Sequence, residues 1–206
     1  MLKSGRPEAV DKIETAAGKL FSKIPMTPNQ WTLLSVVLGA AGFLVSAVYR
    51  NLGQSVILFL AAFAADYIDG SVAKYRKKTT KLGAYIDGVS DRFVEAFIIV
   101  GLMFYDAPNI LVDSKISLAT LLFFSTMTSY TRAYADHKKI VTSENDLRKM
   151  GGLLERFERV SILLASAAAS LYYGSAIIAY ASLFLIVLSG ITVVQRILYS
   201  VKEAGR

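Results

Sequence analysis

Six hydrophobic stretches follow one another along the chain after residue 30, with short polar segments between them. Each has close to the roughly 20 apolar residues that an α-helix needs to cross the hydrocarbon core of a bilayer. Hydropathy therefore predicts an all-α, polytopic membrane protein with a six-helix transmembrane bundle over residues 31–200. The stretches are Trp31–Tyr49, Gly53–Tyr75, Leu82–Tyr105, Ile116–Ala135, Phe157–Tyr173 and Ser175–Leu198.

A different pattern precedes the first hydrophobic stretch. Between Arg6 and Ile24, Lys and Glu separate apolar residues that recur at helical spacing, namely Val10, Ile13, Ala17, Leu20 and Phe21. This spacing predicts an N-terminal amphipathic helix within residues 1–24, lying along the membrane surface. Residues 27–30 then have the sequence of a capping box, with Thr27 as N-cap, Pro28 at the first helical position and Gln30 reaching back. The first membrane helix is expected to begin there.

Composition agrees with a membrane domain and limits the chemistry. Of 206 residues, 54% are hydrophobic and 19% are charged, so the whole of residues 1–206 is expected to form a single membrane domain. Residues 1–23 carry charges throughout and lack the apolar core of a cleavable signal, so the first hydrophobic stretch is expected to be retained. The chain has no cysteine, and its single histidine, His137, lies in a charged loop. Any bound metal is therefore expected to have oxygen ligands.

The basic residues predict an orientation. If both termini face the cytoplasm, 21 of the 23 Lys and Arg residues fall on the cytoplasmic side, and only Arg50 and Lys115 fall on the other. The chain is thus expected to be a multi-pass protein of the cell membrane, with both termini and every candidate reactive residue toward the cytoplasm. We interpret the net charge of +7 as a signal of orientation and of anionic ligands, with no nucleic acid as partner.

Four aspartates interrupt the second and third hydrophobic stretches, where residues 66–91 read DYIDGSVAKYRKKTTKLGAYIDGVSD. Helical periodicity places several small and acidic residues on one face of each helix. They are Asp66, Asp69, Gly70 and Ala73 in the second stretch, and Gly83, Asp87 and Asp91 in the third. Because only a short basic turn separates the two helices, these faces can be aimed at each other, which would bring four carboxylates together.

Converging carboxylates at a membrane edge repel one another and are costly to desolvate. They are expected to bind cations, to be protonated or to sit in a wet cavity. Oxygen ligands favour Mg²⁺, Mn²⁺ or Ca²⁺, and two such ions could clamp a pyrophosphate. The alternative is that individual acids serve as helix caps or surface residues, which becomes hard to sustain for all four at once.

This pattern resembles the signature of the CDP-alcohol phosphotransferase family, D-x-x-D-G-x-x-A-R, eight residues, G-x-x-x-D-x-x-x-D. The chain matches it from Asp66 to Asp91, with the correct number of residues between the two halves. One departure is Lys74, where arginine is usual; lysine keeps the charge and loses the bidentate geometry for phosphate. The resemblance extends over the whole chain, and it implies a homodimer of six-span subunits that depends on Mg²⁺ or Mn²⁺, with two ions per site.

The resemblance also implies a role for each matching residue. Asp66, Asp69, Asp87 and Asp91 would bind metal, and Asp91 would in addition act as general base on the acceptor hydroxyl. The CDP group of the donor would be contacted by Asp69, Gly70, Ala73, Lys74, Thr80 and Gly83, with Asn29 and Thr32 closing the site from the first span. The products would be a new phosphodiester and CMP.

Two further stretches bear on the acceptor. Residues 129–136 read SYTRAYAD and residues 153–159 read LLERFER. These resemble the S-Y-x-K-A-R-A-E and A-E-R-A-E-R stretches of the inositol-phosphate branch, which makes phosphatidylinositol phosphate or its ether-lipid counterpart, archaetidylinositol phosphate. A basic cluster of Arg132, Arg156 and Arg159 would suit the phosphate of inositol phosphate. Tyr134 stands where that branch usually has a second arginine.

Several alternatives remain open at the level of sequence. The three arginines also fit the ordinary excess of cytoplasmic positive charge. The same site could use glycerol phosphate as acceptor, or CDP-inositol as donor in place of a CDP-lipid. Intramembrane acids are also expected in a cation channel or transporter.

Overall fold

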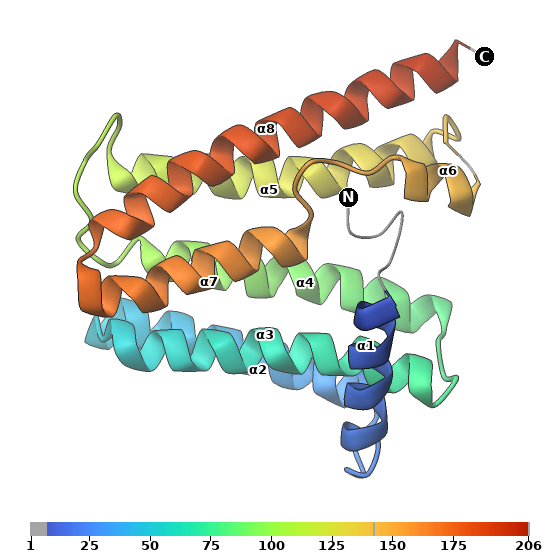
Figure 1. Ribbon diagram of the computed structural model, residues 1–206, viewed down its shortest axis with the longest axis horizontal. Helices are drawn as coiled ribbons and strands as arrows, with labels where there is room; N and C mark the ends of the chain where they lie inside the picture. Colours follow the sequence, from blue (N-terminus) through green and yellow to red (C-terminus); the bar gives the residue numbers. More distant parts are fainter. Residues whose placement is uncertain (1–7, 142, 206) are drawn as a thin grey trace. The chain divides into compact units, whose positions relative to one another are not determined.

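The computed structural model describes residues 8–141 and 143–205, and over these residues all regular structure is helical (Figure 1). The all-α prediction is confirmed. The helices are α1 (Glu8–Phe21), α2 (Pro28–Leu44), a π-helical turn η1 (Val45–Tyr49), α3 (Leu52–Tyr75), α4 (Lys81–Leu102), α5 (Ser114–His137), α6 (Glu144–Lys149), α7 (Arg156–Tyr173) and α8 (Ala176–Ala204).

The six predicted hydrophobic stretches correspond to α2 with η1, α3, α4, α5, α7 and α8. Among the described helices, three are long and apolar enough to cross a membrane: the continuous segment Pro28–Tyr49, Leu52–Tyr75 and Ala176–Ala204. Of the remaining long helices, α4 contains Asp87, Asp91, Arg92 and Glu95, α5 is rich in Ser and Thr, and α7 is shorter, with 18 residues. The chain is therefore an all-helical protein with membrane-type helices.

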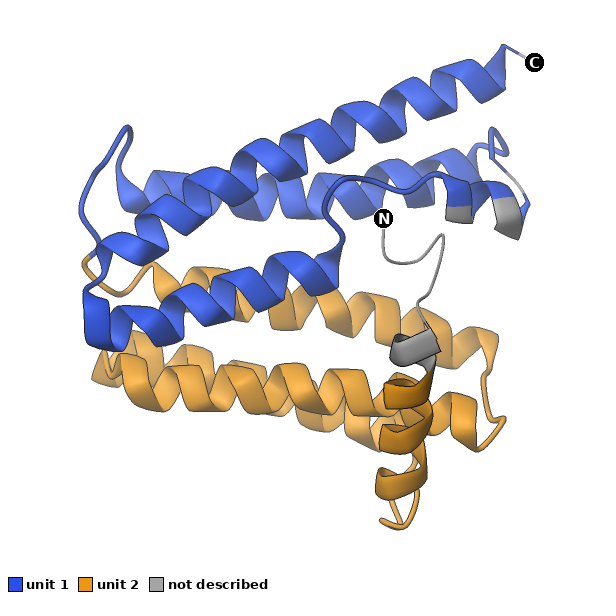
Figure 2. Cartoon of the chain, in the orientation of Figure 1, with its two compact units in different colours: residues 1–5, 107–206 blue, residues 6–106 orange. Residues whose placement is uncertain are grey.

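The chain divides into two compact units, one of residues 6–106 and the other made mainly of residues 107–206 (Figure 2). The unit of residues 6–106, orange in Figure 2, contains α1 to α4 and all four aspartates of the sequence motif. The other, blue in Figure 2, contains α5 to α8 and the three arginines expected at the acceptor.

The start of α2 has the predicted capping box. The backbone N–H of Gln30 donates to Thr27 Oγ1 at 3.3 Å, and the backbone N–H of Thr27 donates to Gln30 Oε1 at 2.8 Å. Pro28 is the first residue of the helix. Since the two bonds satisfy donors that a helix start leaves open, they fix the residue at which α2 begins.

Helix α1 runs across α3 and contacts it closely (Figure 1). Gly18 is buried there: a Cβ at this position would lie 2.6 Å from the carbonyl oxygen of Ser71 and 2.8 Å from Tyr75 Cβ. The absence of a side chain thus permits the approach of the two backbones. Ile13 and Leu20 lie on another face of α1 and are exposed.

Small residues also let α2 and α4 approach α3. Phe59 of α3 is fully buried, and its ring occupies the space that side chains at Gly42 of α2 and Gly101 of α4 would need. A Cβ at Gly42 would lie 2.7 Å from this ring, and one at Gly101 would lie 2.6 Å from it. This is the close helix contact that small residues at helix interfaces allow.

In the unit that contains α5 to α8, buried polar contacts join the helices. The hydroxyls of Ser117 and Ser182 lie 2.7 Å apart and connect α5 to α8. Arg196 of α8 is also buried and donates a hydrogen bond from Nη1 to the carbonyl oxygen of Thr128 on α5. Arg196 is one of the basic residues expected on the cytoplasmic side, and in the structure it connects two helices.

The packing around Phe59 leads to a prediction about stability. We expect Gly42→Ala to lower the free energy of unfolding by about 1–3 kcal/mol, because the added methyl group meets an aromatic ring that has no room to move. Thermal unfolding in detergent measures the change. Gly88→Ala is the matched control, since a Cβ there meets no atom within 4 Å and should be neutral or stabilise α4 by up to about 1 kcal/mol. Equal midpoints for the two variants would contradict this account.

Candidate active site

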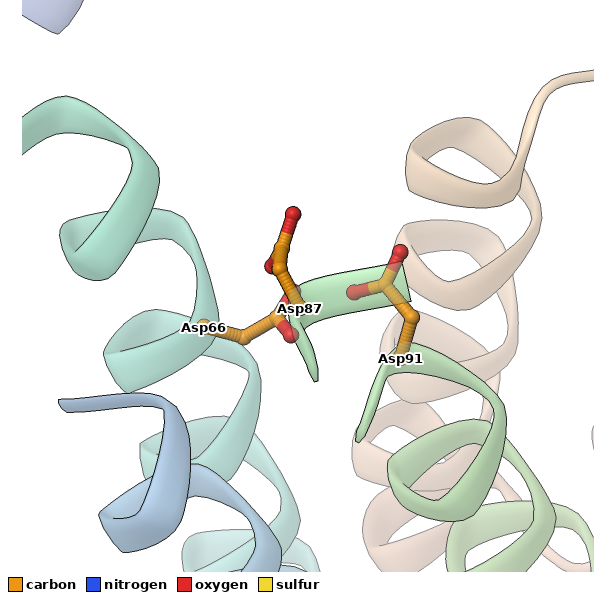
Figure 3. A group of neighbouring side chains, drawn as sticks. All are labelled: Asp66, Asp87 and Asp91. Atoms are coloured by element: carbon orange, nitrogen blue, oxygen red, sulfur yellow. The ribbon is translucent and has the colours of Figure 1, made fainter. Parts of the chain in front are cut away.

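Three carboxylates from two helices lie close together. Asp66 of α3 and Asp87 and Asp91 of α4 each offer one oxygen atom, and these atoms all lie within 4.8 Å of one another. Figure 3 shows the three side chains approaching one another from the two helices. The structure therefore brings together three of the four aspartates that the sequence singled out.

Asp69, the fourth aspartate, contacts α2. Its Oδ2 accepts a hydrogen bond from Thr32 Oγ1 at 2.6 Å, and both side chains are buried. The same hydroxyl lies 3.1 Å from the carbonyl oxygen of Pro28. Asp69 lies one helical turn after Asp66, so the bond to Thr32 connects the start of α2 directly to the carboxylate cluster.

The donor set of the cluster suits a hard divalent cation. It consists of carboxylate oxygens, the ligands that Mg²⁺ and Mn²⁺ prefer, and the chain has no cysteine. His137, the single histidine, belongs to the other unit. Close carboxylates repel one another when ionised, and a cation shared between them removes that cost. The residues present therefore fit Mg²⁺ or Mn²⁺.

Glycines border the acidic helix faces. A Cβ at Gly70 of α3 would meet no atom within 4 Å, so the space next to Asp69 is open. A Cβ at Gly83 of α4 would lie 3.0 Å from Thr80 Oγ1 and 3.7 Å from Asn29 Oδ1. The structure thus brings Asn29 and Thr80 to the same glycine, from the beginning of α2 and the beginning of α4.

Two of the residues expected to contact CDP have structural partners. Thr80 is the N-cap of α4, and its Oγ1 accepts a hydrogen bond from the backbone N–H of Gly83 at 3.0 Å. Lys74, near the end of α3, forms an ion pair with Glu14 of α1. Its side chain is half exposed, and its ammonium group is directed to α1. Ala73, which precedes it, is partly exposed.

The three arginines expected at the acceptor lie on α5 and α7. Arg132 is in the last turns of α5 and Arg156 is the first residue of α7, and both are partly buried. Arg159 lies one turn further along α7 and is only 1% exposed, which is unusual for an arginine. The start of α7 is fixed by a capping box in which the backbone N–H of Glu155 donates to Glu158 Oε2 at 3.0 Å.

One buried acid was not singled out from the sequence. Glu95 of α4 is 2% exposed and lies one turn beyond Asp91, so it continues the row of acids that begins at Asp87. The i, i+4, i+8 spacing could have identified it. The family signature ends at Asp91, so it does not include Glu95.

Comparison with known proteins agrees with this arrangement. The sequence model described as CDP-alcohol phosphatidyltransferase matches residues 25–195. The phosphatidylinositol phosphate synthase of Mycobacterium tuberculosis is 31% identical over 166 residues, which cover 79% of this chain and 72% of that protein. The archaetidylinositol phosphate synthase of Pyrococcus horikoshii is 30% identical over 203 residues, which cover 98% of this chain and 97% of the relative.

Solved structures show the same fold. A crystal structure of the Mycobacterium tuberculosis phosphatidylinositol phosphate synthase with CDP-DAG bound superposes with a TM-score of 0.72 at 25% identity, covering 92% of this chain and 94% of that one. A second crystal structure of that enzyme, in complex with manganese and citrate, gives a TM-score of 0.73 at 25% identity, covering 91% and 88%. The family match spans most of the sequence, including every residue of the carboxylate cluster, and the chain therefore belongs to the CDP-alcohol phosphatidyltransferase family.

Proposed function

We propose that this chain is a membrane enzyme that transfers a phosphatidyl or archaetidyl group from a CDP-lipid to inositol phosphate, with release of CMP. The observation that carries the proposal is the carboxylate cluster of Asp66, Asp87 and Asp91, in a chain of this family. Relatives named phosphatidylinositol phosphate synthase and archaetidylinositol phosphate synthase support inositol phosphate as the acceptor. A CDP-lipid is bound in the solved structure of one of them.

The four aspartates Asp66, Asp69, Asp87 and Asp91 would hold Mg²⁺ or Mn²⁺, with two ions per site. The manganese complex of the relative and the carboxylate donor set support this assignment. When bound, the cations would neutralise the negative charge of the donor diphosphate and of the departing phosphate.

Asp91 would act as the general base. As the acceptor hydroxyl attacks the β-phosphorus of the donor, the Asp91 carboxylate takes the hydroxyl proton. A bond then forms between the acceptor oxygen and the β-phosphorus, and the bond from that phosphorus to the bridging oxygen breaks, so that CMP leaves with the electron pair. No covalent enzyme intermediate is required. The position of Asp91 in the carboxylate cluster supports this role, because the base must lie beside the reacting diphosphate.

The donor nucleotide would lie against the glycines of the two acidic helices. Asn29, Thr32, Asp69, Gly70, Ala73, Lys74, Thr80 and Gly83 would contact its CDP group. The open space at Gly70 and the approach of Asn29 and Thr80 to Gly83 support this location. Lys74 would reach the donor only when its ion pair with Glu14 opens.

Arg132, Arg156 and Arg159 would bind the phosphate group of the acceptor. Guanidinium groups bind phosphate with paired hydrogen bonds, and this geometry distinguishes a phosphorylated inositol from inositol itself. The positions of the three residues in the two stretches that resemble the inositol-phosphate branch support the assignment.

In the membrane, α2 with η1, α3, α4, α5, α7 and α8 would form six spans of a single domain. The length and composition of three of them support this, and the distribution of Lys and Arg supports cytoplasmic termini and a cytoplasmic active site. Helix α1 would lie in the interface, with its exposed Ile13 and Leu20 toward lipid. The subunits would pair as homodimers.

The release of CMP by purified protein tests the reaction. With Mg²⁺ or Mn²⁺ present, we expect CMP from a CDP-lipid and inositol phosphate, and little from glycerol phosphate or from CDP-inositol as donor. Turnover with glycerol phosphate and none with inositol phosphate would overturn the assignment of inositol phosphate as acceptor. Metal-coupled ion flux in liposomes that survives Asp91→Asn, without any CMP release, would overturn the enzyme assignment in favour of a transporter.

The carboxylate cluster leads to a prediction about metal binding. We expect Asp87→Ala to abolish Mn²⁺ binding and to lower turnover by roughly 10²-fold or more, because it removes one of three converging ligands. Titration with Mn²⁺, followed by electron paramagnetic resonance, measures the binding. Asp106→Ala is the control, since Asp106 is an exposed acid beyond the end of α4 and should leave both quantities unchanged. Unchanged Mn²⁺ affinity in Asp87→Ala would refute the metal site.

Arg156→Ala should act mainly on the acceptor. We expect its KM for inositol phosphate to rise by roughly tenfold, with a small change in kcat, because the lost contact binds the acceptor before the transition state. Lys202→Ala, at an exposed basic residue in the last turn of α8, should leave both KM values unchanged. A rise of equal size in the KM values for donor and acceptor would argue against this role.

A further inference from the structure

One guanidinium group binds the connection between α1 and α2. Arg76, the C-cap of α3, donates from Nη1 to the carbonyl oxygen of Met26 at 2.5 Å. Its Nη2 donates to the carbonyl oxygens of Ser22 at 2.6 Å and Ile24 at 2.9 Å. The planar guanidinium suits this task because it presents several N–H donors in a fixed geometry.

The bound connection leads directly into the capping box of α2. Met26 precedes the N-cap Thr27, so the bond from Arg76 fixes the chain immediately before the helix starts. Within the next turns, Asn29 Oδ1 lies beside Gly83, and Thr32 donates its hydrogen bond to Asp69. A displacement of the connection would therefore move the α2 residues that border the carboxylate cluster.

Hydrophobic contacts of Trp31 also hold the start of α2 in place. Trp31 is buried among Ala65, Ile68 and Val72 of α3, with Phe21 and Met26 packed against this group. The rings of Phe21 and Trp31 meet edge to face, with centroids 5.7 Å apart. Trp31 thus contacts α1 through Phe21 and belongs to a cluster that also includes residues of α3, with Met26 of the connection packed against it. In the sequence it lies between Asn29 and Thr32.

We propose that Arg76 is a positioning residue for the CDP-donor subsite. By holding the carbonyl groups of Ser22, Ile24 and Met26, it fixes the beginning of α2 against α3 and α4, and with it Asn29 and Thr32. The inference rests on the proposed function for the identity of the ligand. The donor side of the reaction depends on Arg76, whereas the acceptor side, assigned to Arg132, Arg156 and Arg159, does not.

Steady-state kinetics of full-length protein with Mn²⁺ tests the role, using Arg76→Ala and Arg76→Lys. We expect Arg76→Ala to raise the KM for the CDP-lipid by roughly tenfold or more and to leave the KM for inositol phosphate within about twofold. Arg76→Lys should be intermediate, because an ammonium group keeps the charge and loses the fixed pair of donor nitrogens. Lys78→Ala is the matched control: Lys78 is an exposed basic residue of the same segment, and both KM values should match the parent.

Trp31 supplies a second measurement, since it is the single tryptophan of the chain. We expect its fluorescence emission to shift to longer wavelength in Arg76→Ala, less so in Arg76→Lys, and not in Lys78→Ala. An emission shift with an unchanged donor KM would overturn the proposal, because the connection would then have moved without affecting the donor. Equal rises in both KM values would overturn it as well.

Two further outcomes separate this proposal from others. If Arg76→Ala does not fold, Arg76→Lys carries the test, and a donor KM equal to that of the parent overturns the proposal. If the parent releases no CMP with inositol phosphate, the proposed reaction fails. In that case, Mn²⁺-dependent binding of CDP-lipid tests the role of Arg76 directly. Weaker binding by Arg76→Lys than by the parent supports the role, and equal binding overturns it.

Discussion

Three carboxylates whose oxygen atoms lie within 4.8 Å of one another place an electrostatic constraint on helices α1 to α4. At the effective dielectric constant near a protein surface, two ionised groups at this separation repel by roughly 3–4 kcal/mol. A fold that keeps Asp66, Asp87 and Asp91 together must therefore hold α3 and α4 firmly. Arg92, whose Nη2 lies 3.3 Å from Asp91 Oδ2, offsets one of the three negative charges. A divalent cation bound by the carboxylates of both helices would offset the others and link α3 to α4.

The helices are held in place mainly by close packing. Glycines at positions 42 and 101 let α2 and α4 approach α3 around the ring of Phe59, and Gly18 lets α1 lie directly on the backbone of α3. Near the acidic residues the helices are less crowded, since a Cβ at Gly70 or Gly88 would meet no atom within 4 Å.

Some basic residues of the chain connect helices, and others are exposed on the surface. Arg76 and Arg196 bind backbone carbonyl groups, and Lys74 pairs with Glu14, so these three basic residues connect helices. Exposed lysines lie in the turn between α3 and α4 and at the start of α4, namely Lys77, Lys78 and Lys81. The net charge of +7 therefore includes basic residues that connect helices and others that lie on the surface, which composition alone does not distinguish.

The six long helices, the start of α2 and the acidic face of each of α3 and α4 follow from the sequence, because each depends on residues close together along the chain. Helical periodicity shows which residues share a face, and the capping box at residues 27–30 is a local hydrogen-bonding pattern. Which atoms of distant segments lie opposite one another depends on tertiary packing. Thr32 binds Asp69, Lys74 pairs with Glu14, and Arg76 binds carbonyl groups about 50 residues away, contacts that depend on how α1 and α2 pack on α3. Helical periodicity does not predict such contacts, because it assigns a residue to a face of its own helix and does not specify which segment packs against that face.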